Sequence, residues 1–347
     1  MSRIYLDHAA TTPLRPEARA AMEEGFSVWA NPSSPHAEGR AARRSLEDAR
    51  DRVKRALGWT GEVIFTSGAS EALDIALNRA RATRRVVSAV EHEAVFRAAP
   101  AAEVLPLRDG GPDEAALQAL LAGGGQVLVA VQQINSETGT ILSSADAAFP
   151  TATVRAAGGR VLSDCSQGAG RHALPDCDMA VVSAHKFGGP IGAGALLVRD
   201  FAMLHPVGGH ERGYRQGTEN LPAILGMAAA LEAGGQETWA TTAPERAAFA
   251  DALAAYAELL GPGRQCDHIF AVAHPVLSAQ AQLIRLDALG VAVSAGSACS
   301  SGTLKRSRAL AGFGIAEDVA ARTIRVSIGW NTTADELGRF VELWRGL

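Results

Sequence analysis

The chain has 347 residues, nearly half of them apolar, with 36 glycines and a formal net charge of −4 at pH 7. This length can bury a large core in two domains or subdomains, and the composition is typical of a soluble α/β enzyme. The near-neutral charge gives no reason to expect a nucleic acid or an anionic membrane as a partner, and no apolar run reaches the roughly 18 residues of a membrane span. Because the N-terminus reaches Asp7 without an apolar targeting segment, we expect a cytoplasmic protein.

The four cysteines, Cys165, Cys177, Cys266 and Cys299, are widely spaced and form no C-x-x-C pair. This spacing argues against a disulfide framework or a zinc knuckle and indicates reduced thiols.

In the first half of the chain, short apolar runs alternate with segments of helical periodicity. We expect, in order, a strand at 4–6, a helix from Pro16 to about 29, a helix over 38–57, a strand at 63–65, a helix opening at 66–70 and ending near 79, a strand near 86–87, a helix opening at 91–93, a strand at 104–105, a helix over 113–121 and a strand over 126–131.

The second half continues with a helix that ends near residue 157, a strand at 160–163 and an apolar run at 179–182. Helices are then expected at 221–230 and 244–260, followed by a smaller α/β unit. The alternation predicts an α/β fold with a mostly parallel sheet covered by helices on both faces. We expect a large domain over residues 15–236 and a small domain formed by residues 1–14 and 237–347.

Lys186 stands where the run at 179–182 enters a Gly-rich loop, and it is one of only three lysines, with Lys54 and Lys305. Desolvation shifts a lysine toward its neutral, nucleophilic amine, which can form a Schiff base with a carbonyl cofactor. Lys54 lies among arginines and Lys305 is next to Arg306, so both are expected to be solvated. On this stretch alone, a lysine that extends from a strand end into water explains the pattern equally well.

Further polar residues follow other predicted strands: Ser67–Ser70, His92, Asn135, Asp164 and Ser183–Lys186. In open α/β sheets, ligands lie beyond the carboxyl ends of the strands, so these residues are expected to meet at one site.

The turn Ser67–Ser70, called the phosphate turn below, contains Gly68 and Ala69 and opens a helix. Its backbone N–H groups suit a phosphate, although a turn capped by serine is usually structural. Asp164 in apolar surroundings requires a cation, which a protonated pyridine nitrogen or a structural arginine could provide. His92 is ambiguous, since such histidines often cap helices. Together with Lys186, this inventory fits pyridoxal 5′-phosphate (PLP).

The same residues lie in segments that resemble the motifs of cysteine desulfurases, and they occur in matching order along almost the whole chain. The matching segments are 5–13, 31–34, 65–71, 91–95, 164–167, 183–186, 208–213, 215–218 and 297–299. The resemblance implies a fold-type I, class-V aminotransferase-like homodimer with a seven-stranded type of sheet in its large domain.

The resemblance also implies a role for each site residue. Lys186 would hold PLP, Asp164 would pair with the pyridine nitrogen, His92 would stack on the ring and Gln167 would contact the phenolic oxygen. The phosphate would be bound by Ser70, Ser183 and His185, with Thr218 reaching it from the other subunit. The substrate carboxylate would be bound by Asn31 and Arg325. Asn31 as a loop cap and Thr218 as a turn hydroxyl are the strongest structural alternatives.

Cys299 lies among small and polar residues with no apolar periodicity to bury it, unlike Cys165 and Cys177 beside apolar strands. A mobile, exposed thiol can become a nucleophile when its pKa is lowered. The resemblance implies that Cys299 takes the sulfur of L-cysteine as a persulfide, releases alanine and passes the sulfur to an acceptor or scaffold protein for iron–sulfur cluster assembly or thiolation. Lys186 would move the α-proton of the substrate.

One position departs from the family pattern. The loop after the strand at 126–131 usually carries two asparagines, the second of which contacts PLP, but here it reads Asn135-Ser136. Two other functions therefore stay open: another PLP enzyme of this fold, such as a selenocysteine lyase or an aminotransferase, and a non-catalytic partner in sulfur assembly.

Overall fold

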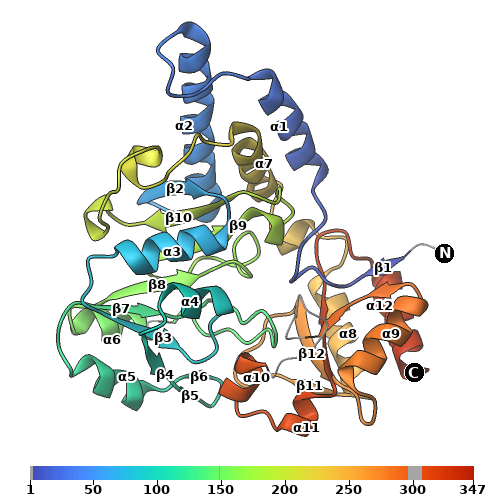
Figure 1. The fold of residues 1–347 in the computed structure, drawn as a ribbon. Coiled ribbons are helices and arrows are strands. Elements are labelled where there is room, and N and C mark those ends of the chain that lie inside the picture. The colour runs from blue at the N-terminus through green and yellow to red at the C-terminus, as the bar shows by residue number, and fades with distance from the viewer. Residues whose placement is uncertain (1–2, 148, 296–306) are drawn as a thin grey trace.

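The computed structural model describes residues 3–147, 149–295 and 307–347 (Figure 1). A seven-stranded sheet forms the centre of its larger unit. Its strands, in spatial order, are β2 (Glu62–Thr66), β10 (Gly194–Val198), β9 (Met179–Ser183), β8 (Arg160–Asp164), β7 (Val127–Ala130), β3 (Arg84–Ser88) and β4 (Glu103–Leu105). Only β10 runs antiparallel to its neighbours, so the expected mostly parallel α/β sheet is confirmed.

Helices cover both faces of this sheet, because its strands are apolar on both sides. In β9, Ala180 and Val182 pack into one core cluster while Met179 and Val181 pack into the other. The first cluster also takes residues from α2 (Ala37–Leu57), α5 (Glu114–Leu121), α6 (Thr151–Ala156) and α7 (Leu221–Glu232), and the second from α3 (Ala69–Arg79) and α4 (Glu93–Ala98). Helix α1 (Pro16–Ser27) packs against α7.

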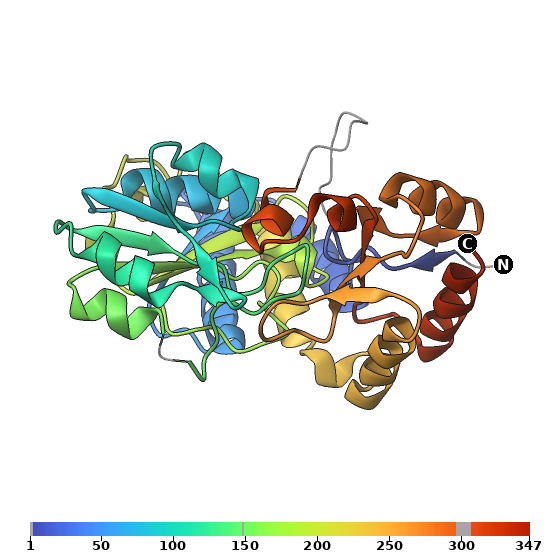
Figure 2. The same ribbon diagram turned by 90° about the horizontal axis from the view of Figure 1, so that it is seen from below.

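The smaller unit is built on a four-stranded antiparallel sheet. Its order is β11 (Glu258–Leu260), β12 (Ile269–Ala273), β15 (Thr323–Ser327) and β14 (Ser294–Ala295), and its other elements are α8 (Ala243–Ala254), α9 (Ala279–Ala288), β13 (Val291–Ala292), α10 (Arg308–Gly312), α11 (Glu317–Ala320) and α12 (Ala334–Arg345). Strand β1 (Ile4–Tyr5) pairs with β13, and Figure 2 shows this blue strand among the orange and red elements. The domain boundaries at residues 15 and 236 stay a prediction.

Two sequence expectations are corrected by the structure. The helix expected over 244–260 ends at Ala254, and the last three residues of that range form β11, because Leu259 and Leu260 pair with β12. Strand β10 was not foreseen behind its Gly-rich loop. Short hairpin strands β5 (Leu107–Arg108) and β6 (Gly111–Pro112) also form in a stretch to which the sequence analysis assigned no element. None of the helices in the described ranges combines the length and apolarity of a membrane span.

Candidate active site

A cavity of about 1030 Å³ opens at the carboxyl ends of the parallel strands, where the larger unit meets β15 and α10. It brings together most of the residues that the sequence singled out: Gly68, Ala69, Ser70, His92, Ser136, Asp164, Gln167, Ser183, His185, Lys186 and Arg325. Asn31 and Thr218 are exposed and are not among the lining residues. Cys299 lies outside the described residues.

Lys186 ends a single 3-10 turn that directly follows β9. Its ammonium donates hydrogen bonds to the carbonyl oxygens of Ala9 (2.7 Å) and Ala10 (2.8 Å), which hold it in the cavity wall. Burial, assisted by the positive charge of Arg325, lowers the pKa of Lys186 to about 8. A substantial fraction of this amine is therefore neutral and nucleophilic near physiological pH.

Arg171 lies behind Lys186 and was missed by the sequence analysis. Its guanidinium donates to the carbonyl oxygens of Gln167 and Lys186, and Thr12 donates a second hydrogen bond to the Lys186 carbonyl at 2.8 Å. Burial lowers the pKa of Arg171 to about 10, and its positive charge contributes to the lowered pKa of Lys186. The only feature of the sequence that could have identified Arg171 is its position after a turn of small residues.

The phosphate turn lies at the N-terminus of α3, where the first N–H groups have no partner within the helix. Gly68 has φ 151°, and a Cβ there would lie 3.8 Å from Ser183 Oγ. His185 Nδ1 lies 3.2 Å from Thr11 Oγ1, and burial, followed by the charge of Lys186, lowers the pKa of His185 to about 4. These groups form a neutral, donor-rich end of the cavity that suits an anion.

Asp164 ends β8 and lines the same cavity. Its Oδ1 accepts hydrogen bonds from the backbone N–H (2.9 Å) and the hydroxyl (2.6 Å) of Ser166. His92 caps α4, since its Nδ1 accepts from the N–H of Ala94 at 3.2 Å, and burial lowers the pKa of His92. The ring of His92 thus has a structural role in addition to facing the cavity.

A second acid, Glu91, was also missed. It accepts hydrogen bonds from the Ser88 hydroxyl (2.7 Å) and the Gln132 N–H (2.8 Å), and burial raises the pKa of Glu91 to about 8. A protonated Glu91 carries no charge, so this buried acid does not require a cation beside it.

Arg325 reaches the cavity from β15 of the smaller unit. It donates to the Ser136 carbonyl at 2.9 Å and to Asp7 Oδ1 at 2.8 Å, while its buried Nε has no partner among the described residues. The side-chain amide of Gln167 donates to Ala9 O at 2.9 Å, and its buried Oε1 likewise lacks a described partner. Unpaired buried polar atoms are costly, so both indicate a place for a polar ligand.

The three described cysteines differ from the cavity groups. Cys165, Cys177 and Cys266 are buried, and burial raises the pKa of each thiol, to about 12 for Cys177 and Cys266. They are protonated and inert at neutral pH, as expected for structural thiols.

Three comparisons with known proteins point to the same family. A family model described as aminotransferase class-V matches residues 4–340. A cysteine desulfurase of Cereibacter sphaeroides is 35% identical, with 99% of this chain and 95% of the relative covered. The cysteine desulfurase IscS of Anaeromyxobacter dehalogenans is 33% identical, with coverages of 98% and 91%. The solved NifS-like protein of Rickettsia africae superimposes with a TM-score of 0.86 at 26% identity, covering 99% of both chains.

Proposed function

Because this chain belongs to the class-V aminotransferase family, we propose that it is a PLP-dependent cysteine desulfurase. It takes the sulfur of L-cysteine, releases L-alanine and holds the sulfur as a persulfide on Cys299 for an iron–sulfur cluster or thiolation acceptor. The observation that carries the proposal is the position of Lys186, a buried amine with a lowered pKa in a cavity that the phosphate turn and Asp164 also line. Relatives that are 31–35% identical over nearly the full chain carry the name cysteine desulfurase.

The residues of the cavity fit PLP. The phosphate turn with Ser70, Ser183 and His185 offers donors to a phosphate, with Thr218 of a second subunit as a further donor. Asp164 suits a protonated pyridine nitrogen, and Nε2 of Gln167, which donates one N–H to Ala9 O and keeps a second, suits the phenolic oxygen. When bound, PLP supplies an electron sink for the carbanion at the substrate α-carbon.

The protein's own groups then have separable tasks. Lys186 holds the cofactor and afterwards moves the α-proton as a general base and acid, which its lowered pKa favours. With PLP bound, Asp164 would hold a proton on the ring nitrogen, and His92 would lie against the ring. The unpaired Nε of Arg325 can receive the substrate carboxylate while Asp7 keeps its Nη2, and Asn31 is the second carboxylate ligand by resemblance.

Ser136 replaces the family's asparagine in the cavity wall. Its backbone carbonyl anchors Arg325, a contact that does not depend on the side chain. Because serine is shorter than asparagine, Gln167 becomes the main direct donor to the phenolic oxygen. The substitution would leave the phenolic oxygen with one direct donor fewer than in relatives with the second asparagine.

The test combines labelling with product analysis. Borohydride reduction of the PLP-loaded protein should tag the peptide that contains Lys186, and L-cysteine should give alanine and a protein persulfide. Cys299→Ser should bind PLP normally and form no persulfide, whereas Cys177→Ala, at the far end of β9, should behave as the wild type. A tag on Lys54 or Lys305, or near-normal alanine release by Cys299→Ser, would refute the assignment.

A further inference from the structure

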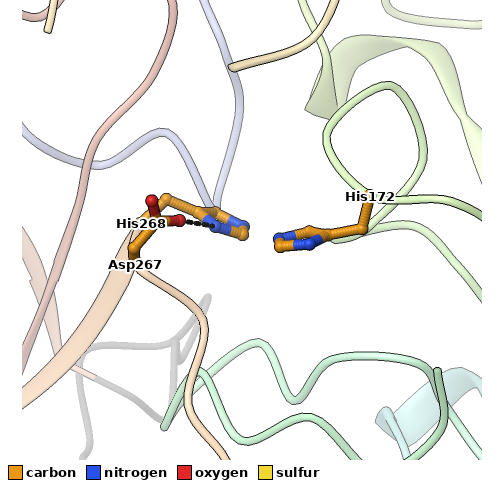
Figure 3. A group of neighbouring side chains, drawn as sticks. All are labelled: His172, Asp267 and His268. Atoms are coloured by element: carbon orange, nitrogen blue, oxygen red, sulfur yellow. Dashed lines mark ion pairs between the residues drawn. The ribbon is translucent and has the colours of Figure 1, made fainter. Parts of the chain in front are cut away.

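A cluster of metal-ligating side chains lies outside the cavity, behind Gln167. His172 belongs to the loop between β8 and β9, and Asp267 and His268 directly precede β12 of the smaller unit. One ligand atom from each residue lies within 4.8 Å of the others, and Figure 3 shows the two imidazole rings pointing toward one another, with the Asp267 carboxylate beside the ring of His268. The cluster therefore connects the larger unit to the four-stranded sheet.

The two histidines differ in how their ring nitrogens are engaged. Nε2 of His172 is buried and has no hydrogen-bond partner among the described residues. Nε2 of His268 lies 3.3 Å from the carbonyl oxygen of Gln167, which can only accept, so this nitrogen carries the proton and Nδ1 carries the lone pair. Nδ1 accepts from the side-chain amide of Gln236 at 3.4 Å, a long contact that a bound ion would replace.

The surroundings resemble the outer shell of a metal site. A ligating histidine usually donates its other N–H to a carbonyl, and a ligating carboxylate is usually hydrogen-bonded in turn. His268 makes the first contact with Gln167. The carboxylate of Asp267 makes the second kind of contact, because Oδ2 accepts a hydrogen bond from Arg246 at 2.8 Å and Oδ1 accepts one from Gln236 at 2.6 Å. Oδ1 also lies 3.6 Å from Nδ1 of His268.

Arg246 also makes the net charge around these three side chains less negative. It offsets the negative charge of Asp267, and Arg171 adds another cation near both rings. Such surroundings disfavour hard cations that depend on several carboxylates. They suit a borderline ion held chiefly by neutral imidazole nitrogens.

We propose that His172, Asp267 and His268 form a binding site for one divalent transition-metal ion of the Zn²⁺ or Co²⁺ class. The two imidazoles and one carboxylate supply three ligands, and water completes the coordination. A bound ion would link the loop that carries Gln167 to β12 and would stabilise the contact between the two units, because binding that is specific to the folded state favours that state. The inference does not depend on the proposed desulfurase activity.

The test uses the full chain without a polyhistidine tag, first treated with a chelator and then titrated with Co²⁺. One ion per chain should bind, with a visible ligand-field spectrum, no intense sulfur-to-cobalt charge-transfer band and a rise in the melting temperature. His172→Gln, at a half-exposed position, should lower the affinity for Co²⁺ by about 10-fold or more. His268→Gln should have the same effect if it folds.

His36→Gln is the matched control, because His36 is an exposed histidine beside a carboxylate, Glu38, at the start of α2. It should bind Co²⁺ as the wild type does. A stoichiometry near zero, an affinity unchanged in His172→Gln, or a charge-transfer band that reports cysteine ligands would each overturn the proposal.

Discussion

At the scale of single residues, Lys186 differs from an ordinary surface lysine because of its neighbours. Two backbone carbonyls hold the ammonium, while burial and two arginines, Arg325 and Arg171, favour its neutral form. Arg171 acts from behind and never lines the cavity, although it also binds the Lys186 carbonyl. We therefore assign Arg171 as a positioning residue that adjusts the pKa of the amine.

This assignment predicts the pH dependence of Lys186 in the cofactor-free protein. The neutral amine, which reacts with acylating reagents, increases as pH rises through the pKa, so labelling of the Lys186 peptide should reach half its maximum near pH 8. Arg171→Met removes a positive charge and should raise that midpoint by about one unit. Mass spectrometry of the labelled digest gives both curves.

Arg52→Met is the control, because Arg52 pairs with Glu232 on the surface. It should leave the midpoint unchanged. A midpoint that stays constant or falls in Arg171→Met would contradict the electrostatic role, and circular dichroism would show whether that variant keeps its fold.

At the scale of elements, the phosphate turn is positioned by the antiparallel strand that the sequence did not reveal. Gly194 begins β10 and pairs with Thr66 at the end of β2 on one side and with Ser183 at the end of β9 on the other. The turn and Ser183 are therefore brought to the same end of the cavity. This arrangement requires close backbone contact, since a Cβ on Gly194 would lie 2.7 Å from Gly68 Cα and from Val182 O.

Gly194→Ala should therefore displace the phosphate turn. We expect a loss of about 1–3 kcal/mol in the free energy of unfolding, because the neighbouring atoms belong to the backbone and cannot rotate away. The affinity for PLP should fall more than that for pyridoxal, which lacks the phosphate. Urea denaturation and fluorescence titration measure the two effects.

Gly338→Ala makes the same chemical change inside α12, where nothing lies within 4 Å of the added Cβ. It should raise the free energy of unfolding by about 0.5–1 kcal/mol and leave PLP affinity unchanged. Equal effects of the two substitutions, or an equal loss of affinity for PLP and pyridoxal in Gly194→Ala, would show that the turn is not held by this contact.

At the scale of the whole molecule, the cavity of one chain lacks two of the residues assigned to it by resemblance. Asn31, in the connection between α1 and α2, and Thr218, before α7, are both exposed and do not line it. We propose a homodimer in which each subunit supplies Thr218 to the other's cavity, which would account for this position. Symmetric association of this kind is the common form of oligomer.

The dimer predicts complementation between two inactive variants. Thr218→Asp places a negative charge against the phosphate, and Lys186→Ala removes the amine. In a heterodimer, one cavity carries both defects and the other carries neither, so random assembly after co-expression should restore about a quarter of the wild-type activity per site. Differently tagged chains allow the heterodimer to be purified and assayed.

Each variant expressed alone is the control and should be inactive. A chain that sediments as a monomer, or a purified heterodimer without activity, would contradict a shared cavity. Recovery would also identify Thr218 as a residue that acts across the subunit interface.

The sequence by itself determined the alternation of strands and helices, and hence the mostly parallel sheet with polar residues at its carboxyl ends. These features depend on local periodicity and on the short reach between a strand and the loop after it. It also singled out Lys186, because lysine is scarce in this chain and this one follows an apolar run.

Only the tertiary structure decided which distant segments complete the site. Asp7 meets Arg325, Arg171 lies behind Lys186, and β10 inserts between β2 and β9. The buried Glu91 and the pair His172–His268 likewise derive their properties from groups far away in the sequence. The burial and the charge state of a side chain depend on all of its neighbours in space, and a local sequence pattern does not contain this information. Contacts in space also decide where α8 ends and β11 begins, because the pairing of β11 with β12 outweighs the local helix propensity of this stretch.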